Sequence, residues 1–518
     1  MEYRIYHTIK EIVKHAEDTY GSCDAVRYKT GKDTIEAKTY RQIGKDSRHF
    51  SQAIEKLGQQ GAHIALIGVT SYPWLVSYFG IVNGGSVAVP LDVALPAEEL
   101  CELMRRADVT MLVVDDIRKD VVEAAKNTCP SLQYIVTMGK EPTEGCLSMK
   151  QLLAQSAEDI CVENAESAKG TDPEKEINPD ALCTIMFTSG TTGKSKGVML
   201  TQRNLAENAT CLDMKIEENS VILSVLPIHH AYCLSMDILK GFSVGSTICI
   251  NDSLMRVARN IQLFRPQIML MVPLMIESLA KKLEAAEGLP AEVVKEKVFG
   301  AQFHTIFSGG AYLNPDYIDL FARYGISVLQ GYGMTECAPV IATTVAWNQK
   351  KDSVGQLLPN CEAKSVDGEL WVRGSSVMSG YYKMPEETAA ALEDGWLKTG
   401  DLGYVDDEGF VYLTGRKKNL IITKNGENVS PEEIENKLST KRLVAEVLVR
   451  EAEGVIEAEI FPDHEYAAKA DIEDVPAKLQ EIIDSYNKDV PAYKRVYRLK
   501  VRKEEFPKTA SQKIKREN

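Results

Sequence analysis

Short apolar runs alternate with helical stretches over residues 62–116, and this rhythm limits the possible fold more than any other feature of the chain. Three of the runs read AHIALIGV, GSVAVPL and VTMLVVDD, and residues 97–106 have helical character. Strands that are apolar throughout and separated by helices are typical of a parallel sheet covered by helices. The sequence therefore predicts an α/β domain.

The same rhythm returns after the polar, acidic residues 156–179, which we interpret as a surface linker. The elements expected there are strands at 182–188, 221–226, 246–250, 268–272 and 305–308, and helices at 204–214, 276–284 and 317–324. After residue 355, shorter strands and turn signals indicate antiparallel structure. From about residue 418 we expect a compact α+β segment with helices at 431–438 and 476–487, a size that suits a separate small domain.

The 518 residues carry a net charge of −14, so binding to nucleic acid or to an anionic membrane is not expected. A basic run at 494–516 is either a solvated face or a surface that meets phosphates. Glycines and Pro73 interrupt the uncharged residues 63–90, which favours a buried strand–helix–strand unit over a transmembrane segment. Eleven scattered cysteines without a CxxC pair predict neither zinc nor disulfides, and the polar start predicts a cytoplasmic protein.

The strongest local signal is the segment FTSGTTGKSKGVMLT at residues 187–201, which follows an apolar strand and leads toward a helix. Glycines let backbone N–H groups converge on an anion, hydroxyls add donors and lysines add charge. The residues expected to bind phosphate are Thr188, Ser189, Gly190, Thr191, Thr192, Gly193 and Lys194. The loop is not a Walker A loop, since a threonine occupies the position of its first glycine. A flexible linker is the alternative, but linkers rarely follow a buried strand directly.

Four further segments follow this loop in order. They are QGYGMTE at 330–336, LKTGDLGY at 397–404, GRKKNLIITKNGENVSPEEIE at 415–435 and PKTASQKIKR at 507–516. Together with the loop, they resemble the signature motifs of the adenylate-forming superfamily, which comprises acyl-CoA ligases, adenylation domains of peptide synthetases and luciferases. The resemblance spans essentially the whole chain and is closest to bacterial long-chain fatty acyl-CoA ligases.

This resemblance implies an α/β fold with two domains. Residues 1–416 would form the N-terminal adenylation domain, with stacked, mostly parallel sheets, helices and a small β-barrel subdomain. Residues 417–518 would form a small, mobile α+β lid. The resemblance also implies that the protein uses ATP, Mg²⁺ and coenzyme A, the last as a co-substrate.

For the nucleotide, the resemblance implies a site assembled from several loops. Tyr332 would stack on adenine, Asp401 would accept hydrogen bonds from the ribose hydroxyls, and Arg416 would add a ribose or phosphate contact. The other nucleotide contacts that the motifs imply are Gly310, Ala311, Gln330, Gly331, Gly333 and Met334. Without the motifs, Asp401 would be interpreted as readily as the first residue of an Asx-turn.

The resemblance also assigns the chemistry. Thr335 would contact the α-phosphate, and Thr191 and Glu336 would hold Mg²⁺, which prefers oxygen ligands. Lys513 would be catalytic, because the attacking carboxylate and the α-phosphate are both negative and need a cation between them. Electrostatic stabilisation of this kind is typically worth about 10²–10³ in rate. Gln512 stands where the motif usually has glycine, which we interpret as the mark of a subgroup.

A second half-reaction needs the lid to move, because a thiol must reach the acyl-adenylate after Lys513 has acted. The resemblance places the hinge at Lys418 and lines the pantetheine channel with Gly426, where the lack of a side chain permits close approach. Rotation about a hinge is a familiar way to assemble one site twice.

The substrate is expected to be a medium- or long-chain fatty acid. The segment PIHHAYCL at 227–234 resembles the border of the acyl pocket, with His230 as its gate and catalytic residue, and it lacks the aspartate of amino-acid-activating members. Asp237 falls beyond this segment, and Ser308, Gly309 and Gly310 are small enough to border a tunnel.

Two alternatives to a CoA ligase were considered. One is an acyl-AMP ligase or stand-alone adenylation enzyme that loads an acyl or peptidyl carrier protein, or an enzyme that activates an aryl acid. The other is a binding protein that has lost the reaction. The presence of Lys513, Glu336 and Asp401 argues against the second alternative.

Overall fold

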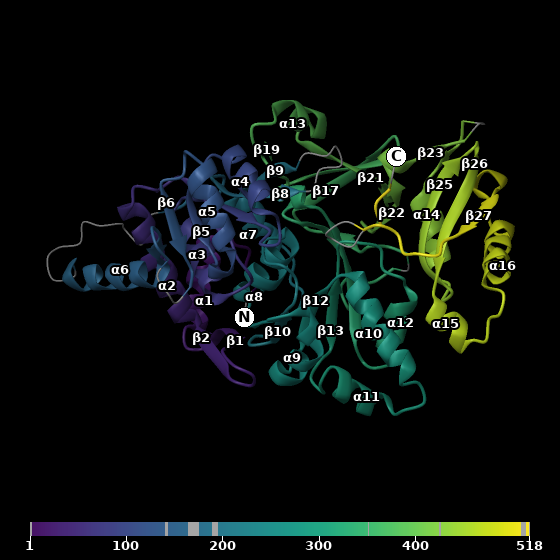
Figure 1. Ribbon diagram of the computed structural model, residues 1–518, viewed down its shortest axis with the longest axis horizontal. Helices are drawn as coiled ribbons and strands as arrows, with labels where there is room; N and C mark the ends of the chain where they lie inside the picture. The colour runs from purple at the N-terminus through teal and green to yellow at the C-terminus, as the bar shows by residue number, and fades with distance from the viewer. Residues whose placement is uncertain are drawn as a thin grey trace.

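The computed structural model contains a large domain built on two main β-sheets and a small domain formed by the C-terminal part of the chain (Figure 1). It describes residues 3–139, 143–163, 176–188, 195–350, 352–423, 426–508 and 514–516, with the backbone alone for 157–163. This is the mixed α/β architecture that the sequence predicts.

The first sheet has eight strands, and its six consecutive strands from β8 to β7 are parallel. Across the sheet the order is β19 (Gly380–Tyr381), β9 (Lys196–Thr201), β8 (Leu182–Thr188), β4 (Val87–Leu91), β3 (His63–Ile67), β5 (Val109–Val114), β6 (Tyr134–Thr137) and β7 (Leu147–Ser148). The strands β9 and β19 run antiparallel to their neighbours. Residues 63–90 thus form the β3–α3–β4 unit expected from the sequence.

The second sheet has nine strands, and the six from β14 to β1 are parallel. Its order is β16 (Gln356–Leu357), β15 (Val340–Thr343), β14 (Ser327–Gly333), β13 (Thr305–Ser308), β12 (Ile268–Met271), β10 (Val221–Ser224), β11 (Thr247–Ile250), β1 (Asp24–Lys29) and β2 (Ile35–Thr39). The first strand of the chain therefore pairs with β11, more than two hundred residues later.

Helices cover both faces of each sheet, because alternate residues of every strand point into different apolar cores. The central core, to which both sheets contribute, contains α1 (Ile9–Tyr20), α2 (Tyr40–Lys56), α3 (Tyr72–Asn83), α7 (Gln202–Thr210), a π-helix (Cys233–Leu239) and α8 (Lys240–Ser243). The outer face of the first sheet carries α4 (Ala97–Arg106) and α5 (Lys119–Thr128). That of the second carries α9 (Val257–Phe264), α10 (Pro273–Ala285), α11 (Ala291–Val298) and α12 (Asp316–Ala322).

An antiparallel five-stranded sheet follows the two large ones, in the region for which a small β-barrel is expected. It consists of β17 (Cys361–Val366), β18 (Glu369–Gly374), β20 (Leu392–Glu393), β21 (Trp396–Val405) and β22 (Val411–Arg416). The short helix α13 (Pro385–Ala391) precedes β20. The antiparallel structure predicted after residue 355 is confirmed.

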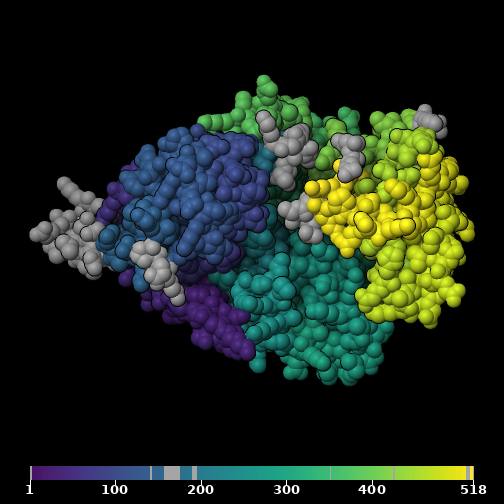
Figure 2. Space-filling view, in the orientation of Figure 1, coloured from purple at the N-terminus to yellow at the C-terminus, as the bar shows by residue number. Residues whose placement is uncertain are grey.

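The small domain has an apolar core of its own, formed by residues between 421 and 501. Its elements are β23 (Ile421–Ile422), β24 (Asn428–Val429), α14 (Pro431–Ser439), β25 (Val444–Ala452), β26 (Val455–Pro462), α15 (His464–Lys469), α16 (Val475–Lys488) and β27 (Arg498–Val501). In Figure 2 this domain, in yellow and yellow-green, lies beside the teal part of the large domain. Arg442 pairs with Glu284 of α10 at 3.0 Å across this contact.

Most element boundaries lie within a few residues of the predicted ones, and helix 97–106 and strand 305–308 agree at both ends. The linker predicted at 156–179 is wrong in its first part, because α6 (Met149–Glu163) extends into it. The amphipathic first half of α6 packs on α2. The linker prediction rested on the acidic residues that follow this half. Among the described residues, no helix is long and apolar enough to cross a membrane.

Candidate active site

The predicted phosphate loop connects two strands of a β-hairpin. Thr188 at the end of β8 lies opposite Lys196 at the start of β9, and Phe187 lies opposite Gly197. The loop residues 189–194 fall outside the described part of the chain. The segment 187–201 leads into a helix as expected, since α7 begins at Gln202, and its second half, Lys196–Thr201, forms the strand β9.

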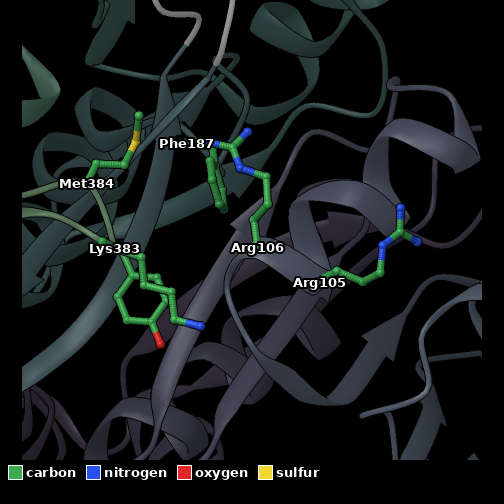
Figure 3. A pocket seen from close by; sticks show the side chains of 6 residues that line it. Arg105, Arg106, Phe187, Lys383 and Met384 are labelled. Carbon is green, nitrogen blue, oxygen red and sulfur yellow. The ribbon is translucent and has the colours of Figure 1, made fainter. Parts of the chain in front are cut away.

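Side chains from the outer helix α4 support this hairpin. The Arg106 guanidinium lies over the Phe187 ring, 5.5 Å from its centroid, and donates a hydrogen bond to the Ser195 carbonyl. Figure 3 shows Arg106 beside Phe187. They belong to a small basic cavity of about 240 Å³ lined by Arg105, Arg106, Phe187, Tyr382, Lys383 and Met384. One arginine thus contacts both ends of the predicted phosphate loop.

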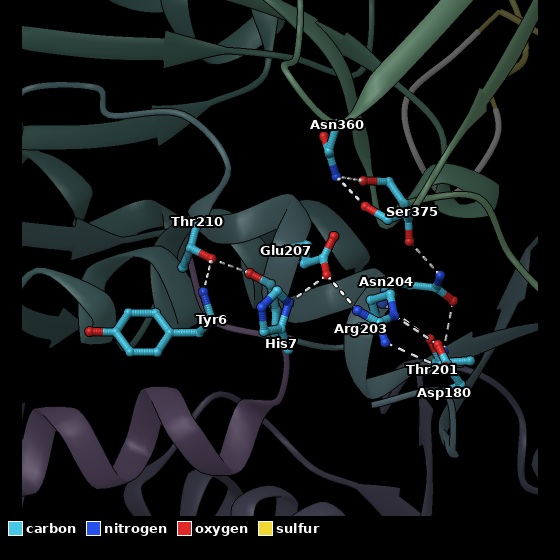
Figure 4. A network of polar contacts seen from close by, with 12 residues as sticks. Tyr6, His7, Asp180, Thr201, Arg203, Asn204, Glu207, Thr210, Asn360 and Ser375 are labelled. Carbon is cyan, nitrogen blue, oxygen red and sulfur yellow. Dashed lines mark hydrogen bonds and ion pairs between the residues drawn. The ribbon is translucent and has the colours of Figure 1, made fainter. Parts of the chain in front are cut away.

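Helix α7 anchors the hairpin to more distant parts of the site. Thr201 caps the helix: its Oγ1 accepts from Asn204 N at 3.1 Å, and Asn204 Oδ1 accepts from Thr201 N at 2.8 Å. The Asn204 Nδ2 group then donates to the Ser375 carbonyl at 2.7 Å, within the polar network shown in Figure 4. Asn208, one turn further on, donates to the carbonyls of Cys337 and Val340. These contacts hold the residues around Glu336.

Glu336 lies in the short helix η4 (Thr335–Cys337), directly after β14, and is only 9% exposed. Its Oε1 accepts a hydrogen bond from the Tyr381 hydroxyl at 2.9 Å, and its carbonyl accepts from Met378 N. Gly333, three residues earlier, passes so close to the chain that an added Cβ would lie 1.9 Å from the Pro339 carbonyl oxygen. The sequence reasoning missed Tyr381, which no pattern links to Glu336.

Three residues predicted to bind the nucleoside are brought together. The Tyr332 hydroxyl donates to Oδ2 of Asp401 at 2.7 Å, and Arg416 Nε lies 2.7 Å from Oδ1. Asp401 on β21 pairs with Arg416 on β22, so the sheet register places these two residues opposite each other. Burial, aided by the Asp401 carboxylate, raises the pKa of Tyr332 well above its ordinary value, so its hydroxyl stays a donor.

The residues predicted for the acyl pocket lie at the carboxyl ends of β10 and β13. A Cβ added to Gly309 would lie 3.0 Å from the Tyr232 ring, and Gly310 has a φ of +88°, which favours glycine. Among the described residues, the buried Ser308 Oγ has no hydrogen-bond partner. Small residues at 308–310 therefore allow Tyr232 to approach this edge of the sheet.

His230 is exposed as a whole residue, but its ring lies against neighbouring protein groups, 4.3 Å from the ring of His229. Burial lowers the pKa of both rings, and for His229, with a further contribution from His230, to about 4. His229 Nε2 is 3.8 Å from Oδ2 of Asp92. The family resemblance named only His230, and no feature of the sequence itself indicates a role for the adjacent His229.

Asp237 is the fully buried carboxylic acid of the π-helix, and its Oδ2 accepts a hydrogen bond from Ser224 Oγ at 2.8 Å. Burial raises the pKa of Asp237 to about 7. This acid therefore belongs to the packing between the helix and β10, in keeping with its place beyond the predicted pocket segment.

The predicted hinge follows β22 without a gap. Lys418 is the middle residue of the short helix η5 (Lys417–Asn419), and burial lowers its pKa. Its neighbour Lys417 places Nζ 2.8 Å from Oε2 of Glu369, a buried residue of β18. An ion pair therefore connects the residue before the predicted hinge to the large domain.

Of the two remaining predicted residues, Lys513 and Gly426, only Gly426 belongs to the part of the chain that the structure describes. Lys513 lies outside the described residues, so its place relative to Glu336 and Asp401 stays a prediction. Gly426 is exposed with a φ of +80°, and its N–H donates to the Thr423 carbonyl at 2.8 Å. This is a tight turn that favours glycine.

The site fits a magnesium ion carried by a nucleotide. Mg²⁺ is usually coordinated by one or two protein carboxylates, and phosphates and water molecules complete its coordination shell. The Glu336 carboxylate is held at Oε1, and no partner for its Oε2 occurs among the residues that the structure describes. In the same part of the chain no group of three His, Cys, Asp or Glu side chains could hold a metal alone.

Comparison with known proteins shows the family to which the chain belongs. The AMP-binding enzyme family matches residues 14–382, and the AMP-binding enzyme C-terminal domain matches residues 418–518. A rat long-chain-fatty-acid–CoA ligase, ACSBG1, is 26% identical over 493 residues, covering 83% of this chain and 67% of the relative. A rice 4-coumarate–CoA ligase-like protein is 29% identical over 457 residues, covering 83% and 78%.

Among solved structures, the anthranilate CoA ligase AuaEII in complex with anthranoyl-AMP superimposes with a TM-score of 0.81 at 22% identity, over 99% of this chain and 96% of that one. The two-sheet domain with its small C-terminal domain is thus the fold of adenylate-forming enzymes. The chain belongs to the AMP-binding enzyme family.

Proposed function

We propose that the protein is an ATP-dependent, AMP-forming ligase that activates a medium- or long-chain fatty acid and transfers it to coenzyme A. The observation that carries the ligase assignment is the convergence of Tyr332, Asp401 and Arg416 next to the helix that bears Glu336. Family membership supports the adenylation step, and the likeness to named fatty-acid–CoA ligases supports the substrate and the acceptor.

The proposed reaction has two steps. A carboxylate oxygen of the acid attacks the α-phosphorus of ATP, and pyrophosphate leaves with the electrons of the broken P–O bond. The coenzyme A sulfur, as thiolate, then attacks the acyl carbon, and AMP leaves. Magnesium, when bound with ATP, neutralises phosphate charge.

This chain's residues take the roles that the motifs imply. Asp401 and Arg416 would orient the ribose, Thr335 would contact the α-phosphate, and Lys513 would lie at the bond that forms between the two anions. His230 would border the acid. Rotation about Lys418 would then remove Lys513 and bring Gly426 to the pantetheine arm.

An aryl acid is the second candidate substrate. The observation that favours it is the close approach of Tyr232 to Gly309, which narrows the pocket edge where an aliphatic chain would pass. The rice 4-coumarate–CoA ligase-like relative, at 29% identity, supports the same candidate.

The deciding experiment is a pyrophosphate-release screen over fatty acids of increasing length and over aryl acids. Each acid is tested with coenzyme A and, in parallel, with a holo acyl carrier protein. We expect release with C8–C18 acids and thioester formation on coenzyme A. Release with aryl acids alone would contradict the substrate assignment, and thioester formed only on the carrier protein would contradict the acceptor.

A further inference from the structure

Tyr381 makes the hydrogen bond that fixes the Glu336 carboxylate. Its hydroxyl donates to Oε1 at 2.9 Å, although 45 residues separate the two positions. Both side chains are buried, at 7% and 9% exposure. A hydrogen bond from a neutral donor to a charged acceptor inside a protein is stronger than one between neutral groups.

The Tyr381 backbone has little freedom to move. Strand β19 pairs with β9, so that Tyr381 lies opposite Val198 in the hairpin that carries the predicted phosphate loop. Its N–H donates to Thr388 Oγ1 at 2.9 Å. The position of Tyr381 is therefore fixed by β9, the strand that follows the predicted phosphate loop.

The Tyr381 ring also contacts a charged side chain of β9, the strand that follows the predicted phosphate loop. Lys196 Nζ lies 4.8 Å from the ring centroid, within the range of a cation–π contact. An ionised carboxylate has no hydrogen to give, so the Tyr381 hydroxyl is the donor in its contact with Glu336. The Tyr381 side chain thus contacts both Lys196, the first residue of β9, and Glu336, the predicted metal ligand.

We propose that Tyr381 is a positioning residue for the metal-binding carboxylate. Its hydroxyl holds Oε1 of Glu336, which leaves Oε2 for the magnesium ion that accompanies ATP. Because the ring lies on Lys196, the carboxylate is aligned with the loop that binds the phosphates. This inference rests on the proposed function, in which Glu336 contacts Mg²⁺.

The test measures ATP binding rather than catalysis. Isothermal titration calorimetry gives the Kd for ATP with saturating Mg²⁺ and with EDTA, and the ratio of the two is the magnesium gain. We expect Tyr381→Phe to lower this gain about tenfold, the effect of one hydrogen bond to a charged group. Its Kd in EDTA and its Tm should match those of the wild type.

The neighbouring tyrosine provides the control. The Tyr382 hydroxyl donates to Asp108, away from Glu336, so Tyr382→Phe should leave the magnesium gain unchanged. Glu336→Gln should lower the gain, and adding Tyr381→Phe to it should change nothing more, because two residues that act through one contact are not additive.

The outcomes separate this inference from the proposed function. A wild-type gain in Tyr381→Phe, with a reduced gain in Glu336→Gln, overturns the positioning role alone. A wild-type gain in Glu336→Gln overturns the metal contact and the positioning role together. Equal weakening of ATP binding with and without Mg²⁺ in Tyr381→Phe makes the tyrosine a general support of the fold and also overturns the inference.

Discussion

Asp401 has partners for both of its carboxylate oxygens inside the protein, Tyr332 on one side and Arg416 on the other. A carboxylate held in this way has one fixed orientation. Such preorganisation lowers the entropic cost of binding. The predicted nucleoside site therefore contains a network of contacts in addition to a motif.

At the residue scale, the first prediction removes one member of this network. Tyr332→Phe should raise the KM for ATP roughly tenfold, because a hydrogen bond to a charged group is worth about 1.5 kcal/mol or more. Initial rates at varied ATP check this. Tyr404→Phe on the same strand as Asp401 is the matched control, since the Tyr404 ring stacks on Tyr412 instead. Identical KM values in both variants would show that Tyr332 does not position Asp401.

The second residue-scale prediction concerns Lys513. Lys513→Ala should slow acyl-adenylate formation by roughly 10²–10³, the usual value of one electrostatic group at a transition state. Thioester formation from supplied acyl-AMP should stay near the wild-type rate, because the lid is expected to carry Lys513 away before that step. The two half-reactions are measured separately, with Lys515→Ala as the control. A similar loss in both half-reactions would contradict this division of roles.

How far sequence reasoning reached differs between residues. Glu336 and Asp401 could be named because they stand inside motifs that are local in the chain. Tyr381 and Asn208 could not be found, because their contacts join positions 45 and more than a hundred residues apart. No local pattern encodes such a pairing, which arises only when the strands assemble.

At the element scale, the central strands of both sheets were the most predictable parts, because continuous apolar runs bounded by turn residues have few other interpretations. The helix α6 was missed because its second half enters the polar, acidic stretch that was interpreted as a linker. The long-range pairing of β1 with β11 could not be predicted either, since nothing in a short apolar strand specifies a partner.

The hinge belongs to this scale, and Lys418→Pro tests it. Proline fixes φ at about −65° and removes a backbone donor, so it should restrict rotation of the small domain. Adenylation needs one orientation and should survive, whereas thioester formation should fall at least tenfold, a loss of about 1.4 kcal/mol in transition-state stabilisation. Separate assays of adenylation and thioester formation test whether only the second step is impaired.

The control for the hinge is its neighbour Lys417, whose ion pair with Glu369 is half-exposed. Lys417→Ala should leave adenylation intact, because the buried Glu369 carboxylate keeps its hydrogen bonds from Gly400 N and Trp371 Nε1. A Lys418→Pro variant with normal Tm and normal rates in both half-reactions would remove Lys418 as the pivot. Loss of both rates with a lowered Tm would instead indicate a damaged domain junction.

At the scale of the whole molecule, the separate core of the small domain predicts separate unfolding. Leu479 is fully buried in that core, and Leu479→Ala should cost about 2–5 kcal/mol. Differential scanning calorimetry should show a transition that moves to lower temperature and a second, larger one that does not move. Leu283→Ala, in a core of the large domain, should shift the larger transition instead. A single transition shifted by both variants would mean that the two domains unfold as one cooperative unit.

The pairing of β1 with β11 also has a consequence during synthesis of the protein. The ribosome makes α1, β1 and β2 well before β11, so β1 lacks this neighbouring strand until residue 250 has been translated. At roughly 5–20 residues per second, that delay is on the order of 10–40 s. Over this interval β1 can pair with β2 on one edge, but its other edge lacks β11. Nascent chains of this protein are therefore expected to depend on chaperones that shield an N-terminal segment.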